Sequence, residues 1–238
     1  MVFSDTVTNL GVVQQVRGFM RVDANQWPTA KIVNSVNNWL DGFTGYAIGA
    51  DRRFQWDDTN HTALPEGVTD LVANQSDYSF LTDEQGNQIL NLTRIDIKDS
   101  SGNWRKLSVR DQVEINIGMG EDQRTAGEPI FYDKIADNII RLSPKPINSV
   151  TGGLKFFFQR TPSYVTASDT TKSLGVPPIL QRGAVISAAY DGAITLGLKN
   201  LNALAREKER EDLKMREWFD NRNTDEVKFI RPTVRSAR

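Results

Sequence analysis

Residues 90–109 read LNLTRIDIKDSSGNWRKLSV, and this stretch decides which kind of fold to expect. Apolar and polar side chains alternate along its first nine residues, with a shift of phase near Arg94, and such alternation is typical of a β-strand with one buried face. The turn cluster DSSGN follows at 99–103, and a second β-patterned run begins at Trp104. The stretch therefore predicts a β-hairpin closed by a short loop.

Further short runs of this kind follow the hairpin. Residues 129–133 and 138–142 flank another turn, and Pro144 should end the second strand because proline cannot donate to a sheet ladder. Residues 154–160, LKFFFQR, predict one more strand, whose consecutive phenylalanines indicate burial on both faces or contact with another body. We expect five or six strands in an antiparallel meander within residues 54–174.

The residues before this β region have helical periodicity. One apolar stripe follows the break at Pro28, a residue tolerated in a first helical turn, and consists of Ile32, Val36, Trp39 and Phe43. A weaker stripe predicts an earlier helix with Ser4 as its N-cap, and consists of Val7, Leu10, Val13 and Val16.

Helical spacing returns after the β region, from Ile186 to Leu204. The following residues, 205–217, carry equal numbers of acidic and basic side chains and predict a solvated or subunit-facing helix. A straight helix over 178–221 would be about 65 Å long at 1.5 Å per residue. We therefore expect a bend near residues 197–200.

Together these patterns predict an α+β fold. The helices of residues 1–53 and 175–222 should form one helical body. Neither apolar stripe can be buried without another helix to cover it, and chain ends often lie close together. Residues 54–174 then form an antiparallel β domain inserted into that body. Residues 223–238 have no periodicity and predict an extended C-terminal tail.

The composition excludes several classes of function. There is no cysteine and a single histidine, so disulfides, thiolate metal sites, cysteine nucleophiles and multi-histidine sites are impossible. With 29 Lys and Arg against 30 Asp and Glu, the net charge of −1 gives no general attraction to nucleic acid. The first residues lack the pattern of a secretory signal, so we expect synthesis and folding in a cytoplasm.

Few residues suggest chemistry. The cluster Asp57–His61 is more typical of a polar loop than of a cation site, and Gly118–Gly120 lacks the residues that a phosphate loop needs. There is no nucleophile elbow. We expect no catalytic residue, no metal and no cofactor, with an acid–base pair at Asp57 and Asp58 as the remaining enzymatic alternative.

Aromatic residues are the more informative group. If the β region has more aromatic side chains than the core of a small sheet can bury, the remaining ones would mark a subunit interface. The candidates for this interface are Trp104, Phe156, Phe157, Phe158 and Trp218.

Several segments resemble head-to-tail adaptor (connector) proteins of tailed bacteriophages. They are FQWDDTNHTALP at 54–65, LVANQSDYS at 71–79, IDIKDSSGNWRKL at 95–107, and PIFYD at 129–133 through LSPKP at 142–146. The resemblance covers about residues 54–180, and its motifs are turns and strands rather than catalytic signatures.

The resemblance implies a structural protein of the virion neck, made in the cytoplasm of the host bacterium. Such proteins form a homo-oligomeric ring, usually of twelve copies, that docks beneath the portal protein and continues the DNA channel. A downstream neck or tail protein would be the second partner, and genomic double-stranded DNA would pass without specific binding. Portal docking would fall to the C-terminal tail, with Phe229, Ile230, Arg231, Pro232, Val234 and Arg235.

Three alternatives remain at this point. The protein could be another neck or tail component, such as a stopper or a tail-terminator. It could be a hydrolase or lyase that uses carboxylates near Asp57 and Asp58. It could also bind DNA through the basic residues between Arg206 and Arg216, although equal numbers of acids argue against this.

Overall fold

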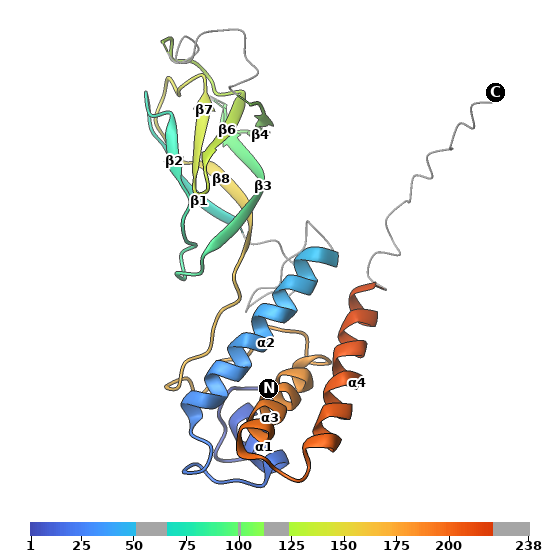
Figure 1. Cartoon of the computed structure of the whole chain (residues 1–238). Helices are drawn as coiled ribbons and strands as arrows, with labels where there is room; N and C mark the ends of the chain where they lie inside the picture. The colour runs from blue at the N-terminus through green and yellow to red at the C-terminus, as the bar shows by residue number, and fades with distance from the viewer. Residues whose placement is uncertain (51–65, 100, 112–123, 221–238) are drawn as a thin grey trace, which may run out of the picture.

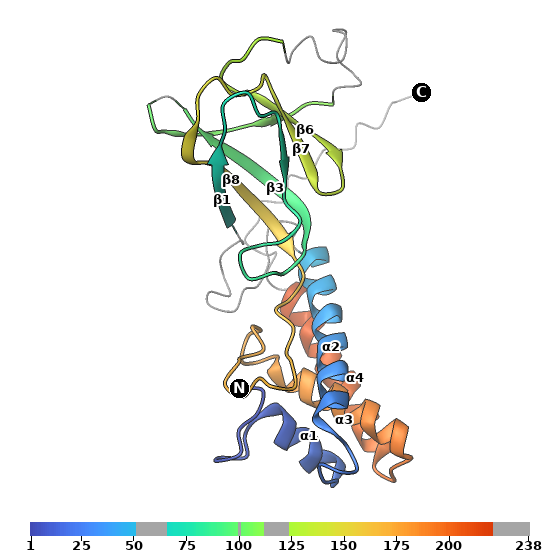
Figure 2. The same cartoon turned by 90° about the vertical axis from the view of Figure 1, so that its left-hand side faces the viewer.

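The computed structural model describes residues 1–50, 66–99, 101–111 and 124–220. Within them, four helices form one body and eight strands form a second body, stacked above the first along one long axis (Figures 1 and 2). The predicted α+β class is confirmed.

The helical body joins the two ends of the sequence. Its elements are α1 (Val12–Met20), α2 (Thr29–Ala50), α3 (Gln181–Leu196) and α4 (Leu201–Asp220). Helix α3 lies in the middle and packs against each of the other three. All four helices contribute to one hydrophobic cluster, so the packing expected between the N-terminal and C-terminal helices is present.

Helix α2 follows the predicted stripe. Ile32, Val36, Trp39 and Phe43 are all buried. Its hydrogen bonding begins at the carbonyl of Pro28, which accepts from the amide of Lys31 at 3.0 Å. The opposite face carries Gly42, Gly45 and Gly49, where an added Cβ would meet nothing within 4 Å. One side of α2 is therefore tightly packed and the other is open.

The first helix starts later than the sequence predicts. Val7 is 90% exposed and precedes α1, because the Asp5 carboxylate accepts the amides of Val7 and Thr8 at 2.9 and 3.0 Å. These bonds form a turn that competes with the helix. Asn9 then has a positive φ of 58°, and Gly11 occupies the N-cap position in place of Ser4.

The bend predicted near residues 197–200 is present. Helix α3 ends at Leu196, Gly197 adopts the left-handed conformation with φ 61°, and α4 begins at Leu201. Glycine has no Cβ to resist this conformation, which explains why the helix stops here.

The second body is a sandwich of two four-stranded sheets, with strand orders β1-β8-β3-β4 and β2-β7-β6-β5. The strands are β1 (Glu66–Leu71), β2 (Asp77–Ser79), β3 (Ile89–Lys98), β4 (Trp104–Lys106), β5 (Ser108–Val109), β6 (Phe131–Ala136), β7 (Ile139–Ser143) and β8 (Val150–Arg160). All pairings are antiparallel except β5 with β6.

The predicted single meander is wrong in its topology. Strand β8 lies between β1 and β3, although β1 is separated from it by most of the sandwich sequence. Two facing layers bury the apolar side of each sheet, which a single small sheet could not do for itself.

The predicted hairpin is correct in its first half. Strands β3 and β4 pair antiparallel, with Lys98 opposite Trp104. The pairing of β3 with β8 shifts register between Leu92 and Arg94, where the sequence pattern changes phase. A β-bulge explains that change. The second half differs, because the chain leaves this sheet at Leu107 and enters the other sheet as β5.

The sandwich has a hydrophobic cluster of its own, which includes Ile95, Leu107 and Phe158. After β8 the chain returns to the helices, so that Val165 and Leu174 belong to the helical cluster. No helix packs along a strand within the described residues. The two bodies thus have separate cores.

Candidate interaction surfaces and the junction of the two bodies

The outer face of the sheet β1-β8-β3-β4 carries aromatic rings with cations over them. Trp104 is 40% exposed, and the ammonium groups of Lys98 and Lys155 lie 5.1 and 5.0 Å from the centre of its ring. The guanidinium of Arg94 lies 5.6 Å from the ring centre of Phe157. Attraction between a cation and the face of a ring holds these long side chains together on the surface. We call these five residues the cation–aromatic face.

Only one of the three consecutive phenylalanines points outward. Phe156 and Phe158 are 6% and 2% exposed and belong to the sandwich core, whereas Phe157 lies on the cation–aromatic face. Successive side chains of a strand point to opposite sides of the sheet, which separates Phe157 from its neighbours. The set of interface candidates on β8 is corrected accordingly to Phe157.

Trp218 lies close to the end of α4 and is half-buried. Its ring meets the ring of Phe219 edge to face, with 4.9 Å between their centres. Phe219 is 5.4 Å from Phe43 of α2, so these aromatics close the end of the helical core. Trp218 thus lies at the edge of the helical core, neither fully buried nor fully exposed.

The charged residues of α4 form ion pairs with one another and with α3. Lys208 and Asp212 are 2.8 Å apart, and Arg182 and Arg210 both contact Glu207, at 3.0 and 2.7 Å. These pairs engage the cations that a DNA-contacting helix would direct at phosphates. The arrangement favours a helix that interacts with water and protein.

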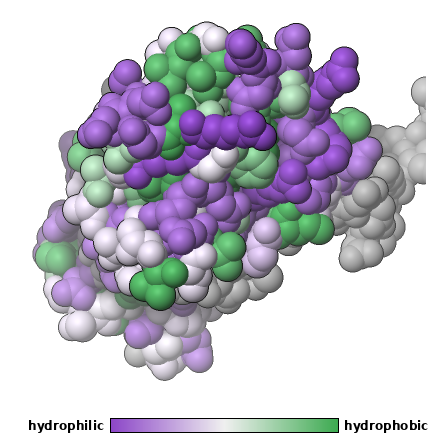
Figure 3. Space-filling model, turned by 90° about the horizontal axis from the view of Figure 1, so that it is seen from below, coloured by the Kyte–Doolittle hydropathy of each residue, from purple (hydrophilic) through white to green (hydrophobic). Residues whose placement is uncertain are grey.

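A groove of about 440 Å³ runs between α2 and α4. It is lined by Asn38 and Gly42 of α2 and by Lys208 of α4, and Arg216 donates a hydrogen bond of 3.1 Å from α4 to the Tyr46 hydroxyl of α2. Both polar and apolar side chains line the groove. Seen from the helical end, hydrophilic residues cover most of the surface and separate small hydrophobic areas (Figure 3).

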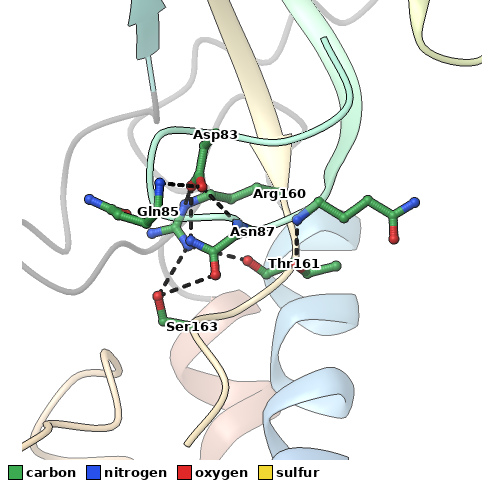
Figure 4. Close-up of polar contacts among 7 residues, drawn as sticks. Asp83, Gln85, Asn87, Arg160, Thr161 and Ser163 are labelled. Atoms are coloured by element: carbon green, nitrogen blue, oxygen red, sulfur yellow. Dashed lines mark hydrogen bonds and ion pairs between the residues drawn. The ribbon is translucent and has the colours of Figure 1, made fainter.

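A buried polar network lies where the sandwich meets its connection to the helices (Figure 4). The side chains of Arg160 and Asp83 are 3% and 9% exposed, and Arg160 Nε lies 3.3 Å from Asp83 Oδ2. Asn87 Nδ2 donates to the same oxygen at 2.9 Å, while Arg160 Nη1 donates to Ser163 Oγ at 3.5 Å. We call Asp83, Asn87, Arg160 and Ser163 the polar clasp.

The polar clasp ties a turn to the end of a strand. Asp83 Oδ1 accepts the amides of Gln85 and Asn87 at 3.0 and 2.7 Å, which shapes the turn before β3. Arg160 is the last residue of β8. Sequence analysis did not single out either residue. The available signal was an arginine at the end of a largely apolar strand, since a buried arginine needs a carboxylate partner.

A second set of contacts fixes the same connection to helix α2. Asn37 Nδ2 donates to the carbonyl of Val165, and its Oδ1 accepts the amide of Val165, both at 3.0 Å. The Tyr164 hydroxyl donates to Asp41 at 2.6 Å. Burial, together with this hydrogen bond and the negative charge of Asp41, raises the pKa of Tyr164 to about 12.

Several predicted sites lie outside the described residues. These are Asp57, Asp58 and His61, the segment Gly118–Gly120, and the tail residues Phe229–Arg235. Within residues 1–50, 66–99, 101–111 and 124–220, no three metal-ligating side chains gather at one place. None of the helices described there is both long enough and apolar enough to cross a membrane.

Comparison with known proteins gives one family for this chain. No curated protein shows a significant match to the chain. A family model described as SU10 adaptor protein matches residues 8–228, which include both bodies. The chain therefore belongs to the SU10 adaptor protein family, a family of phage head–tail adaptors.

Proposed function

We propose that this protein forms a closed ring, of twelve copies as is usual for head-to-tail adaptors, that docks beneath the portal and continues the DNA channel toward the tail. The observation that carries this proposal is the family match over residues 8–228. In this role the protein catalyses no reaction. Its partners are copies of itself, the portal protein, a downstream neck or tail protein, and the genomic DNA that passes through.

The two-body architecture supports a role between two partners. The helices and the sandwich lie at opposite ends of one long axis (Figures 1 and 2), so each end can meet a different neighbour. The net charge of −1 and the ion pairs on α4 suit a conduit, because many free cations would hold DNA by its phosphates.

We assign contacts between copies to three aromatic residues that are exposed or half-buried at the surface. The cation–aromatic face presents the rings of Trp104 and Phe157 and the guanidinium of Arg94 on one sheet. Aromatic residues and arginine are enriched at protein interfaces. Trp218 offers a partly exposed ring on the helical body. A ring repeats each contact at every copy, so modest pairwise contacts suffice for a stable assembly.

Portal docking is assigned to the C-terminal tail. Residues 227–238 carry four basic and no acidic side chains, interspersed with Phe229, Ile230 and Val234. A segment that becomes ordered on docking loses conformational entropy at that moment, which many copies acting together offset.

Electron microscopy of the purified protein mixed with purified portal tests this proposal. We expect a ring coaxial with the portal, and removal of residues 223–238 should abolish docking while the circular dichroism spectrum stays that of a folded protein. A control variant keeps the tail length but replaces residues 229–235 by Gly and Ser, and it should also fail to dock.

Two results would contradict the assignment. Normal docking of the truncated protein would exclude the tail as the portal contact. A native protein that binds only a tail-side component and never the portal would be a stopper or terminator rather than an adaptor.

Weak retention on duplex DNA at about 0.15 M salt is expected for a conduit.

A further inference from the structure

The orientation of the sandwich relative to the helices needs a physical cause. The two bodies have separate hydrophobic clusters, and no helix packs along a strand within the described residues. A broad interface, which is the usual way to fix two bodies, is therefore not what holds the described parts together. Among the described residues, what remains is the chain that leads from β8 back to the helices.

The described connection is held at both of its ends. At the sandwich end, the buried pair of Arg160 and Asp83 anchors the chain, and Thr161 exchanges two further bonds with Gln88, one from its amide at 2.9 Å and one to its Oγ1 at 3.1 Å. At the helical end, Asn37 holds the backbone of Val165 through paired hydrogen bonds. We call residues 160–165 the connecting segment.

Little free chain remains between the two anchors. Pro162 has its φ fixed by the pyrrolidine ring, Ser163 belongs to the polar clasp, and Tyr164 is bonded to Asp41. Figure 4 shows Ser163 directed back toward Arg160 and Asn87. Each residue of the connecting segment is thus restricted by the ring of proline or by a hydrogen bond.

We propose that the connecting segment sets the orientation of the sandwich on the helical body, and that the ion pair between Arg160 and Asp83 is the contact whose loss frees it. Residues 161–163 then act as a hinge about which the sandwich moves as one body. A buried ion pair suits this role, because separating two buried opposite charges is costly and so makes the held state strongly preferred. This inference concerns the single chain and does not depend on ring formation.

Distance measurements by electron paramagnetic resonance test the proposal. The chain has no cysteine, so spin labels can be attached at Asn34→Cys on α2 and Lys134→Cys on β6 without other changes. Labelled protein is diluted tenfold with unlabelled protein, which removes distances between copies. The native chain should give one narrow distribution, and Asp83→Asn should at least double its width.

A matched control comes from a second ion pair in the same sandwich. Arg141 of β7 donates to both carboxylate oxygens of Asp77 of β2 at 2.7 and 2.9 Å, in the sheet that does not contain β8. Asp77→Asn therefore removes an ion pair between the same residue types, although a more exposed one, from another part of the sandwich and should leave the distribution narrow. Equal broadening by both variants would overturn the proposal, since it would indicate general loosening of the sandwich.

The helical anchor provides an independent variant. Asn37→Ala combined with Tyr164→Phe removes the contacts to α2 without touching the sandwich, and it should also double the width. If Asp83→Asn proves unable to fold, this double variant alone tests whether the connecting segment sets the orientation. A folded variant at either anchor with the native width would show that the connecting segment does not set the orientation.

Discussion

The helical body and the sandwich are stabilised in different ways. The helical core is assembled from the two ends of the sequence, because α1 and α2 pack on α3 and α4. The sandwich draws its core from one continuous insertion, between Leu71 and Phe158. The helical body therefore requires both chain ends before it can form, while the sandwich contains every residue of its own core. We expect the two bodies to unfold as separate units.

The largest expected effect separates the two cores. Phe158→Ala removes a ring that is 2% exposed, which should lower the free energy of unfolding of the sandwich by about 3–5 kcal/mol. Phe157→Ala, one residue away on the outer face, should cost much less. Hydrogen exchange followed by mass spectrometry should show faster exchange in the strands and unchanged exchange in the helices. Equal acceleration in both bodies would show that they unfold as one.

A smaller effect is expected from a glycine pair in the helical body. A Cβ at Gly11 would lie 2.4 Å from the backbone nitrogen of Asp5, so Gly11→Ala should destabilise that body by about 1–3 kcal/mol. Gly18 lies inside α1 with nothing within 4 Å of an added Cβ. Gly18→Ala should instead stabilise it by about 0.5–1 kcal/mol, because alanine favours a helix. Urea unfolding followed at the helical circular dichroism band measures both, and changes of the same sign would refute the steric argument.

The smallest effect concerns the junction at high pH. The pKa of Tyr164 is raised to about 12 in the folded protein, above the ordinary value of 10.0. The unfolded chain therefore loses this proton first, so the stabilisation is complete below about pH 10 and is lost as the pH rises through about 12. Burial also raises the pKa of Tyr78 and of Tyr132, so carbon-13 NMR of labelled tyrosine should show several late-titrating signals, of which one disappears in Tyr164→Phe. Ordinary titration of that signal near pH 10 would contradict the contact with Asp41.

The helical body could be predicted from sequence far more completely than the sandwich. The stripe from Ile32 to Phe43 depends on spacing within one helix, and Gly197 marks the bend by its own conformational freedom. Both are local signals. The one failure, the start of α1, came from the Asp5 side chain, whose bonds to backbone amides compete with helix formation.

The order of strands in the sandwich had no such local signal. Individual strands are visible in the sequence as alternation of apolar and polar residues, and the bulge near Arg94 as a shift in its phase. The pairing of β1 with β8, in contrast, joins residues far apart in the sequence. The polar clasp was missed for the same reason, because Asp83 and Arg160 meet only once the sheets are in place. That Phe157 is half-buried and Phe158 fully buried likewise depends on which face of β8 the second sheet covers.

The crossing at Leu107 has a mechanical consequence for a protein in a virion neck. The amide of Leu107 donates to Ile95 in one sheet, and the amide of the very next residue, Ser108, donates to Ile130 beside the other. Because consecutive residues make these two bonds, a shear force on one sheet is transmitted directly to the other sheet. A force on the sandwich should therefore displace both sheets together rather than slide one past the other.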